Sequence, residues 1–559
     1  QNKIMIKNTR FKLKKRFPNL YYLASFIKFL FKKNSIIFNF QVFRKLKKVT
    51  QTFPENQYSN NSKKILFFSA RQDSDQVTVL TILRWSMQLR GHETIVLGCD
   101  QAICNSCNSG SSPKLNKWQC ERCFKYASLF HDYSGANIDW MKSLLINSDL
   151  DEAKNIINNL MPSEFYDFIY DGLPIGELVQ VSIAHFMKTN KINLESETDI
   201  LIYKNWLESA IIQVRSFGRY LDKIKPDKIV MINGLFSAER IMLELARLRN
   251  IDVICYEVGF KPETFFFNQN APVNMCNNEY WPHYKQKTLS ESENNELDYY
   301  LIERNKGKGY LINYFPNILT DKNVIANKFH IDFNKKTFLI FPNITWDSTL
   351  YNCDLFFDSM VDWILETISY FVDKNELQLI IRTHPAETRL ENADRDPVLK
   401  IIKNHFPSLP SNIIVLPSDS NVSSYLLMEN AYCGIVYGST TGIEMGLRGV
   451  PVITVGKIYY RDQGVSIDPN SKEEYFNILN EFSNSSYSFD RKLSVELWRR
   501  YAYFAIFRSA LPLSQLTYST TQVFPSISFE DARDLLPGKS KSLDIICEGI
   551  ANSGKFLIE

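Results

Sequence analysis

The sequence predicts an α/β protein with two tandem units, each built on a parallel sheet that is covered by helices on both faces. Three observations support this fold. The chain has 559 residues, more than a single hydrophobic core normally serves. Two separate stretches alternate short apolar runs with segments of helical periodicity, the order that parallel sheets require. The composition, 45% hydrophobic and 13% aromatic, supplies apolar material for two cores and argues against global disorder.

The first series predicts a Rossmann-like domain over residues 60–300. Its expected elements are a strand at 65–68, a helix at 77–89, a strand at 94–97, a strand at 228–232, a helix at 238–249 and a strand at 253–256. Residues 137–225 carry helical periodicity with few strand signals. We therefore expect a helical insertion within this first domain.

The second series predicts a Rossmann-like domain over residues 325–490. Strands are expected at 337–341, 377–382, 412–416, 433–437 and 451–455, and helices at 355–371, 397–405, 421–428 and 472–482. Residues 491–559 should form C-terminal helices and a tail, with a helical part at 494–510 that is expected to cross back. Two such units in tandem leave a cleft between them, and ligands of such sheets bind beyond the carboxyl ends of the strands.

The charge of the chain is concentrated at its N-terminus. Residues 1–50 contain fourteen Lys or Arg and no acid, so the remaining residues carry 51 basic against 61 acidic side chains, a net charge of −10. A nucleic-acid enzyme would be expected to spread basic charge over its folded surface, so this class is disfavoured. The basic segment, 1–55, is a separate feature.

This N-terminal segment has two interpretations that the sequence leaves open. Its longest uncharged stretch, Phe17 to Ile27, is too short to span a bilayer, and no cleavage site of a signal peptide follows it. Basic side chains interleaved with aromatic ones predict an interfacial anchor on an anionic membrane surface. The alternative is a solvated helix that caps the first domain.

Two polar motifs follow strands of the second domain. Arg382, Thr383 and His384 come directly after one strand, and Ser439, Thr440 and Thr441 come after another and open a short helix. Hydroxyl groups, free backbone N–H groups and a neighbouring cation bind phosphate oxygens. These motifs predict a phosphate site, with Glu444 as an acceptor for ribose hydroxyls; the alternative for either motif alone is a helix cap or a fixed loop.

The same segments resemble the capsule-polysaccharide biosynthesis glycosyltransferases, which include the bacterial Kdo transferases. The resemblance rests on Arg382–Glu387, Gly438–Glu444, Gly449–Ile453 and Pro342–Asp347, and more loosely on 233–259. It implies a GT-B-like fold, with two Rossmann-like doubly wound domains facing a central cleft. It also implies that the second domain holds a nucleotide-activated sugar and that the first holds the acceptor.

By this resemblance, donor-binding residues can be assigned one by one. Arg382 and His384 would contact the donor phosphate, the hydroxyls of Ser439, Thr440 and Thr441 would complete the phosphate site, and Asn343 would lie on the nucleotide side. Tyr459, Tyr460 and Arg461 would close over the sugar or simply pack. Related motifs occur in transferases that use cytidine nucleotides, so a cytidine-activated donor is implied. The sequence shows no Asp-x-Asp motif, and no catalytic metal is expected.

Transfer to a hydroxyl needs a group that accepts its proton or a tightly positioned donor. Glu257 is the first candidate because it ends a predicted strand of the first domain. Asp347 in the second domain is its rival, and Arg240, at the start of the helix after Asn233, completes the candidate catalytic set. An acid at a strand end can equally serve as a helix cap or an ion-pair partner.

Four cysteines form a second constellation in the first domain. Their spacing is Cys104-x2-Cys107-x12-Cys120-x2-Cys123, within a cysteine-rich stretch at 99–123. Two thiolate pairs at this spacing predict a structural zinc in a ribbon-like insertion that braces the edge of the sheet. An iron–sulfur cluster, a pair of disulfides and Cys99 as a substitute ligand remain alternatives.

Together these features predict a cytoplasmic glycosyltransferase, peripheral to the inner face of the plasma membrane if the basic segment anchors it. Its substrates would be a nucleotide-sugar donor and a polysaccharide or glycolipid acceptor, with no nucleic-acid partner. The rivals are a sugar-nucleotide epimerase with a similar two-domain fold, a transferase of CDP-glycerol of the teichoic-acid type, and a non-catalytic scaffold around a zinc ribbon. The donor sugar, the acceptor and the anomeric outcome cannot be derived from the sequence.

Overall fold

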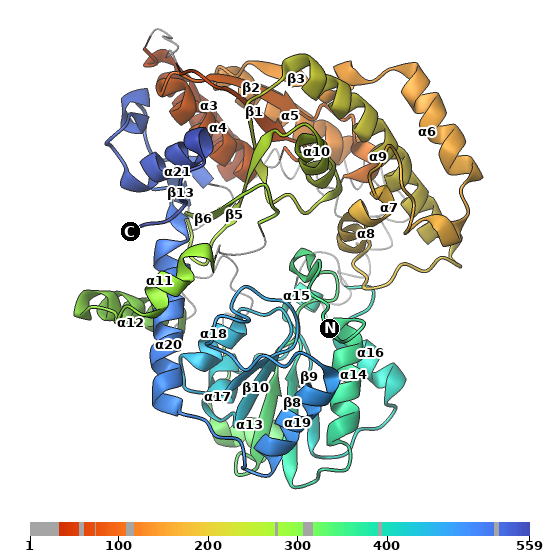
Figure 1. Cartoon of the computed structure of the whole chain (residues 1–559), viewed down its shortest axis with the longest axis vertical. Helices are drawn as coiled ribbons and strands as arrows, with labels where there is room; N and C mark the ends of the chain where they lie inside the picture. The colour runs from red at the N-terminus through yellow and green to blue at the C-terminus, as the bar shows by residue number, and fades with distance from the viewer. Residues whose placement is uncertain are drawn as a thin grey trace.

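The computed structural model describes residues 33–54, 61–72, 74–107, 117–273, 278–305, 317–389, 394–518 and 525–559. It shows two α/β units, drawn one above the other in Figure 1, each with its own sheet. The two parallel-rich sheets confirm the α/β class predicted from the sequence.

The first unit contains a seven-stranded sheet in the order β12-β6-β5-β4-β1-β2-β3. Its strands are β1 (Lys64–Ser69), β2 (Glu93–Gly98), β3 (Ile138–Trp140), β4 (Lys228–Ile232), β5 (Asp252–Val258), β6 (Thr264–Gln269) and β12 (Leu511–Pro512). The five strands from β3 to β5 run parallel, but β6 is antiparallel to β5 and to β12. The prediction of a purely parallel first sheet is therefore wrong at this edge, because residues 259–263 are too few for a crossover helix and form a hairpin instead.

Helices cover both faces of this sheet, which explains the continuous apolar run in β1. Leu66 and Phe68 belong to one buried cluster, with residues of α9 (Glu197–Ile224) and α10 (Ser237–Leu248). Ile65 and Phe67 belong to a second cluster, with residues of α4 (Ser74–Leu89) and α21 (Lys541–Asn552). Because successive side chains of a strand point to opposite faces, a strand that is buried on both sides needs apolar residues at every position.

The predicted helical insertion lies between β3 and β4. It consists of η2 (Met141–Leu144), α6 (Asn147–Asn159), η3 (Pro162–Glu164), α7 (Ile175–Leu178), α8 (Gln180–Met187) and the long helix α9. Ser196 caps the N-terminus of α9 by accepting a hydrogen bond from the backbone of Asp199. The insertion covers the right-hand side of the first unit in Figure 1.

The second unit contains a five-stranded parallel sheet in the order β11-β10-β7-β8-β9. Its strands are β7 (Lys336–Ile340), β8 (Leu377–Arg382), β9 (Ile413–Leu416), β10 (Cys433–Val436) and β11 (Val452–Thr454). The helices are α13 (Lys322–Phe329), α14 (Met360–Phe371), α15 (Ala386–Arg389), α16 (Val398–His405), α17 (Ser424–Glu429), α18 (Thr441–Gly446) and α19 (Lys472–Ser483). Each expected strand of this series is present.

The C-terminal segment returns from the second unit to the first. Helix α20 (Arg491–Tyr503) packs its fully buried Trp498 against α18, and a π-helical turn at Phe504–Arg508 leads into β12. After β12, the hairpin of β13 (Leu516–Tyr518) and β14 (Pro525–Ile527) and helix α21 pack on the first unit. In Figure 1, α20 runs along one side of the molecule from the lower unit toward the upper one.

Helix α3 (Lys33–Gln51) is the described part of the basic N-terminal segment. Val42, Leu46 and Val49 are buried in the core of the first unit, and Lys48 pairs with Glu530 at 2.7 Å. This part of the segment therefore caps the first unit, the second of its two interpretations, and residues 1–32 lie outside the described residues. Within the described chain, every helix lacks the length or the apolar content that a membrane span requires.

A second set of contacts joins the two units on the side of α8. The Nζ of Lys188, at the end of α8, lies 3.5 Å from the ring centroid of Trp346 in the second unit. The Trp346 Nε1 donates to Asp394 Oδ1 at 2.6 Å, and the backbone N–H of Arg395 donates to the Lys188 carbonyl at 2.9 Å. Arg395 also pairs with Asp199. These contacts fix the second unit beside the helical insertion.

Two buried carboxyl groups lie in this contact region. The Glu387 side chain is 1% exposed and accepts a hydrogen bond from the backbone of Val398 at 3.0 Å. Burial, aided by the nearby Asp394, raises the pKa of Glu387 to about 7, and burial raises the pKa of Asp394 to about 6. Burial thus shifts both groups toward the protonated form, so that near neutral pH Glu387 is protonated in a large fraction of folded molecules, whereas Asp394 is mostly ionised.

Replacement of Gly446 should destabilise the link between α18 and α20. An added Cβ would overlap the Trp498 ring, so Gly446→Ala should lower the free energy of unfolding by about 1–3 kcal/mol in urea titrations. Gly218→Ala in α9 is the matched control, because its Cβ would come no closer than 3.2 Å to another side chain, at Arg249 Nη2. Equal effects of the two substitutions would contradict the packing argument.

The raised pKa of Glu387 gives a pH-dependent prediction. Between its ordinary pKa of 4.5 and about 7, the folded state keeps a proton that the unfolded state loses, so stability falls as the pH rises through this window. Glu387→Gln removes this loss. We expect the variant to exceed the wild type by about 1–3 kcal/mol at pH 8 and to match it at pH 5, in urea unfolding followed by circular dichroism. The exposed Glu376→Gln should show no such difference, and a variant no more stable than wild type at pH 8 would refute the argument.

Candidate functional site

The carboxyl ends of three neighbouring strands of the second sheet carry the predicted donor residues. Asn343 follows β7, the Gly438 turn follows β10, and His384 follows β8. The Asn343 side chain accepts from the Gly438 N–H at 3.2 Å and donates to the Gly438 carbonyl at 3.1 Å. This pair of hydrogen bonds joins two loops that are 95 residues apart in the sequence.

Asp347 lies in the same group of loops. Its Oδ1 accepts from the backbone of Thr349 at 3.0 Å, as the N-cap of η5 (Ser348–Leu350), and its Oδ2 lies 3.2 Å from Asn343 Nδ2. The backbone N–H of Ala386 donates to His384 Nδ1 at 3.1 Å. Burial lowers the pKa of His384, and the negative charge of Asp347 opposes this shift. Asp347 thus acts as a cap and as a charged neighbour of His384.

Arg382 is turned toward the loop after β9. Its guanidinium donates to the carbonyl oxygens of Thr383, Pro417 and Ser420, at 3.0, 2.9 and 2.6 Å. The side chain is 3% exposed, and burial lowers its pKa to about 10. In this conformation, Arg382 holds the loops together, and the predicted phosphate contact would require some of these bonds to open.

The hydroxyl motif after β10 is compact. The Ser439 Oγ lies 2.9 Å from Thr441 Oγ1 and accepts from the Thr441 N–H at 3.3 Å, while Thr440 stands at the N-cap of α18. The Tyr460 hydroxyl donates to the Ser439 carbonyl at 2.7 Å. Ser439, Thr440 and Thr441 are therefore held next to Asn343 through the Gly438 turn.

Glu444 has a partner that its position in the sequence does not reveal. Arg304, near the end of α12 (Glu291–Asn305), donates from Nε to Glu444 Oε1 at 2.5 Å. Both side chains are largely buried, so this ion pair is shielded from water. In this conformation, Arg304 therefore competes with a ribose for the Glu444 carboxylate.

Tyr460 and Arg461 pack rather than reach over a ligand. Tyr460 is fully buried against Trp498, with ring centroids 5.3 Å apart, and Arg461 donates to the carbonyl oxygens of Thr454 and Pro469. Tyr459 lies beside Phe260 of the first unit, with 5.9 Å between ring centroids. Of the two roles considered for Tyr460 and Arg461, closing over the sugar or packing within the protein, this conformation shows packing.

Glu257 ends β5 at the carboxyl edge of the first sheet. Its Oε2 accepts from Asn233 Nδ2 at 2.8 Å, and its Oε1 accepts from the Val258 N–H at 2.8 Å. Burial raises the pKa of Glu257 above its ordinary value, although these two hydrogen bonds and the charge of Arg71 oppose the rise. A carboxylate with a raised pKa is better suited to accept a proton at neutral pH than an exposed one.

Arg71 is a residue of this edge that sequence reasoning missed. It follows β1, pairs with Glu239 at 2.8 Å and lies 4.3 Å from the Phe236 ring centroid. Glu239 is only 1% exposed and stands in the first turn of α10. The rule that strand ends carry site residues could have found Arg71, because it comes three positions after a predicted strand.

Arg240 and residues of both units line a cleft of ≈570 Å³. Leu235 lies in the loop after β4, Tyr351 follows β7, Gly438 follows β10, and Lys457 follows β11. The Arg240 guanidinium lies 5.1 Å from the Tyr351 ring centroid and 3.1 Å from Glu244 Oε1. The volume is in the range of sites for small ligands, about 300–1,000 Å³. Arg240 is therefore placed where a ligand between the two units would meet it.

The four-cysteine prediction is not tested by the described residues. Cys120 and Cys123 lie on helix α5 (Lys117–Tyr133), and Cys107 follows η1 (Cys104–Ser106), but the side chain of Cys104 lies outside the described residues. Among the side chains that the structure describes, no three of His, Cys, Asp or Glu are grouped as metal ligands. The second pair thus stands on a helix rather than a β-ribbon, and structural zinc stays a prediction.

Comparisons with solved structures show low similarity. A beta Kdo 2,4 transferase, KpsC of Thermosulfurimonas dismutans, is 14% identical over 56% of this chain and 87% of its own length, with a TM-score of 0.32. A UDP-GlcNAc 2-epimerase from Neisseria meningitidis is 11% identical over 78% of this chain and 98% of its own, with a TM-score of 0.24. Because these scores are low, no conclusion about this chain rests on either likeness.

Comparison at the level of sequence is more decisive. No curated protein matches the chain. Residues 262–481, which include the loops of Asn343, His384 and Ser439, match a family described as capsule polysaccharide biosynthesis protein. This match confirms the resemblance that the sequence motifs predict. The matched segment covers the second unit and the last residues of the first, so the similarity to capsule polysaccharide biosynthesis proteins is a property of this part of the chain.

Proposed function

We propose that the protein is a GT-B-like glycosyltransferase that moves a sugar from a nucleotide-activated donor to a growing surface polysaccharide or glycolipid. The observation that carries this proposal is the meeting of loops from both units around one cleft. Loops of the second unit that follow β7, β10 and β11 line this cleft, and Arg240 lines it from the first unit. His384, after β8, and Glu257, at the end of the first sheet, are not among its lining residues. The match of residues 262–481 to capsule polysaccharide biosynthesis proteins supports a sugar substrate.

The donor would bind on the second unit. His384 follows β8, and Ser439 and Thr441 follow β10, the two strands that flank β7 in the sheet. The carboxyl ends of parallel strands are the place where ligands of such sheets bind. The hydrogen bonds between Asn343 and Gly438 fix the loops after β7 and β10 relative to each other. The side chains that would bind the phosphate are therefore ordered before the substrate arrives. The motif resemblance supports a cytidine nucleotide as the activating group.

The acceptor would approach from the first unit. Glu257 is the proposed proton acceptor, because its pKa is raised and Asn233 fixes its orientation. Asp347 is the less favoured candidate, because it lies on the second unit among the proposed donor loops, where its Oδ1 caps η5. Arg240 would stabilise the negative charge that develops on the leaving phosphate.

Nucleotide binding tests the donor site. We expect calorimetry with CMP, CDP, UDP and GDP to show preferred binding of a cytidine nucleotide, and His384→Ala to weaken it by about 10–100-fold, the value of a hydrogen bond to a charged group. His405→Ala is the matched control, because His405 is exposed at the end of α16 and should leave the affinity unchanged. Absence of binding for all four nucleotides would overturn the proposed donor class.

Sugar transfer tests the proton acceptor. Glu257→Gln should lower kcat by about 10²–10⁴-fold with little change in donor affinity, measured as product formation from a CMP-activated sugar. In the wild type, activity should rise with pH through a pKa above the ordinary carboxyl range, because the ionised form accepts the proton. The opposite pattern, with a large loss for Asp347→Asn and none for Glu257→Gln, would transfer the role to Asp347.

A further inference from the structure

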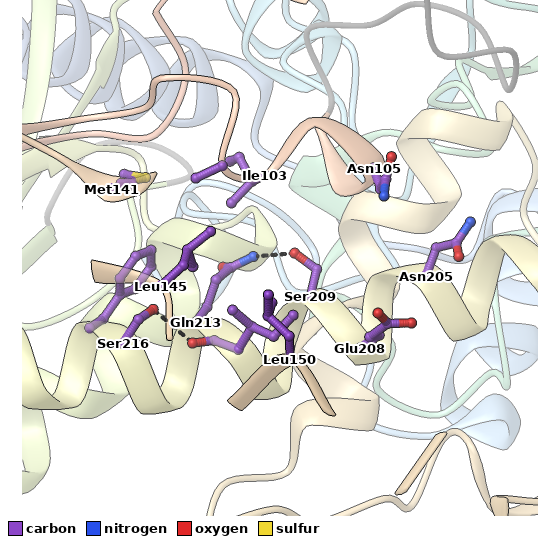
Figure 2. A pocket seen from close by; sticks show the side chains of 13 residues that line it. Ile103, Asn105, Met141, Leu145, Leu150, Asn205, Glu208, Ser209, Gln213 and Ser216 are labelled. Carbon is purple, nitrogen blue, oxygen red and sulfur yellow. Dashed lines mark hydrogen bonds between the residues drawn. The ribbon is translucent and has the colours of Figure 1, made fainter. Parts of the chain in front are cut away.

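A cavity of ≈170 Å³ lies within the first unit and shares no lining residue with the cleft between the units. Its walls come from the turn before and within η1, which follows β2, from η2, which follows β3, and from helices α6 and α9. Figure 2 shows the lining side chains gathered around a common space above α9. The cavity thus lies beyond the carboxyl ends of two parallel strands, a common position for ligands in this class of sheet.

Part of the wall is apolar, and Asn105, Asn205, Glu208 and Ser216 add polar side chains elsewhere in the lining. Ile103, Met141 and Phe217 are 6%, 1% and 2% exposed, and Leu145 and Ile212 complete this part of the lining. Removal of apolar surface from water is favourable, so these side chains favour a ligand that contacts them with apolar carbon atoms. Cavities of about 150 Å³ accept a ring of benzene size, so the space fits one six-membered ring with a small substituent.

Gln213 brings a polar group to this apolar space. Its side chain is 2% exposed, and its Nε2 donates to Ser209 Oγ at 2.8 Å. Within the described part of the chain, the buried Gln213 Oε1 has no hydrogen-bond partner. Figure 2 shows the amide between Leu145 and Ser209, with its end directed toward the space below Ile103. Because buried polar groups in proteins nearly always have a hydrogen-bond partner, we expect a ligand in the cavity to donate a hydrogen bond to this oxygen.

Ser209 adds a second polar group beside the amide. Its Oγ accepts from Gln213 Nε2 and also from Ser106 Oγ, at 2.5 Å. Because both of these bonds use the oxygen as an acceptor, the Ser209 proton can donate to a further group. One hydroxyl in the cavity could therefore donate to Gln213 Oε1 and accept from Ser209 at the same time.

We propose that this cavity binds a small amphipathic alcohol, with a compact apolar ring against Ile103, Met141 and Phe217 and one hydroxyl at Gln213 and Ser209. A water molecule would serve the polar groups but would leave the apolar wall without contacts. A sugar, with a hydroxyl on most of its carbons, would place some of its polar groups against Ile103, Met141 and Phe217, which offer side chains without hydrogen-bonding groups. The proposal is independent of the transferase activity.

Ligand-observed NMR with the full chain tests this site, using cyclohexanol as the probe. Saturation transfer from the protein should be saturable in the millimolar range. Cyclohexanone has nearly the same shape but can only accept hydrogen bonds, so it should bind at least about fivefold more weakly, the effect of one lost hydrogen bond. Equal affinity for the alcohol and the ketone would contradict the role of Gln213 Oε1.

Two variants locate the binding. Gln213→Leu keeps the size of the side chain but removes the amide, and should abolish the preference for the alcohol. Leu145→Trp, at the half-buried rim, should fill the cavity and remove binding of both probes, even if Gln213→Leu fails to fold. An undiminished signal in Leu145→Trp, or no saturable signal in the wild type, would overturn the proposal and leave water as the occupant.

Discussion

The arrangement of the two units depends on the return of the chain after the second sheet. Trp498 is buried against Gly446 of α18, and thirteen positions later Leu511 pairs with Phe265 at the edge of the first sheet. One continuous segment is therefore packed into both cores. The contact of Lys188 with Trp346 joins the units at a second place. With two such joints, the carboxyl edges of the two sheets are held around one cleft, and Arg240 of the first unit comes to lie beside Tyr351 of the second.

Within the second unit, one amide side chain organises the donor loops. Asn343 uses both ends of its amide on the backbone of Gly438 and also lies within hydrogen-bond distance of Asp347. An aspartate at this position could not donate, and a leucine could do neither, so the residue type follows from the geometry. Because β7 and β10 are neighbours in the sheet, their loops are adjacent before any ligand binds, and the hydrogen bonds only fix their register.

The sequence predicts the central strands well and the edges poorly. The strands Lys228–Ile232 and Leu377–Arg382 match the predicted bounds, because burial on both faces leaves a continuous apolar run. Strand β12 has two residues, and its pairing partner lies about 245 positions earlier, so no local pattern marks it. The same holds in the site. The motifs place Asn343, His384 and Ser439 on one edge of the second sheet. The ion-pair partners are different: Arg304 pairs with Glu444, and Arg71 pairs with Glu239. Each pair joins segments that are far apart in the sequence, and the periodicity of a helix or strand does not predict such pairs.

These distant partners change which charges are available to a ligand. Arg382 looked like a phosphate ligand from its place in the sequence, yet its guanidinium donates to three backbone carbonyls, and Glu444 is neutralised by Arg304. The cations that line the cleft are instead Arg240, Arg247, Lys457 and Arg461, against the carboxylate of Asp462. Arg461 also donates to backbone carbonyls, and Arg240 and Arg247 both pair with the single carboxylate of Glu244. The positive character of the cleft therefore comes from Lys457 and from the excess charge of these two arginines over Glu244. A phosphate-bearing ligand in this cleft would therefore meet positive charge from both units.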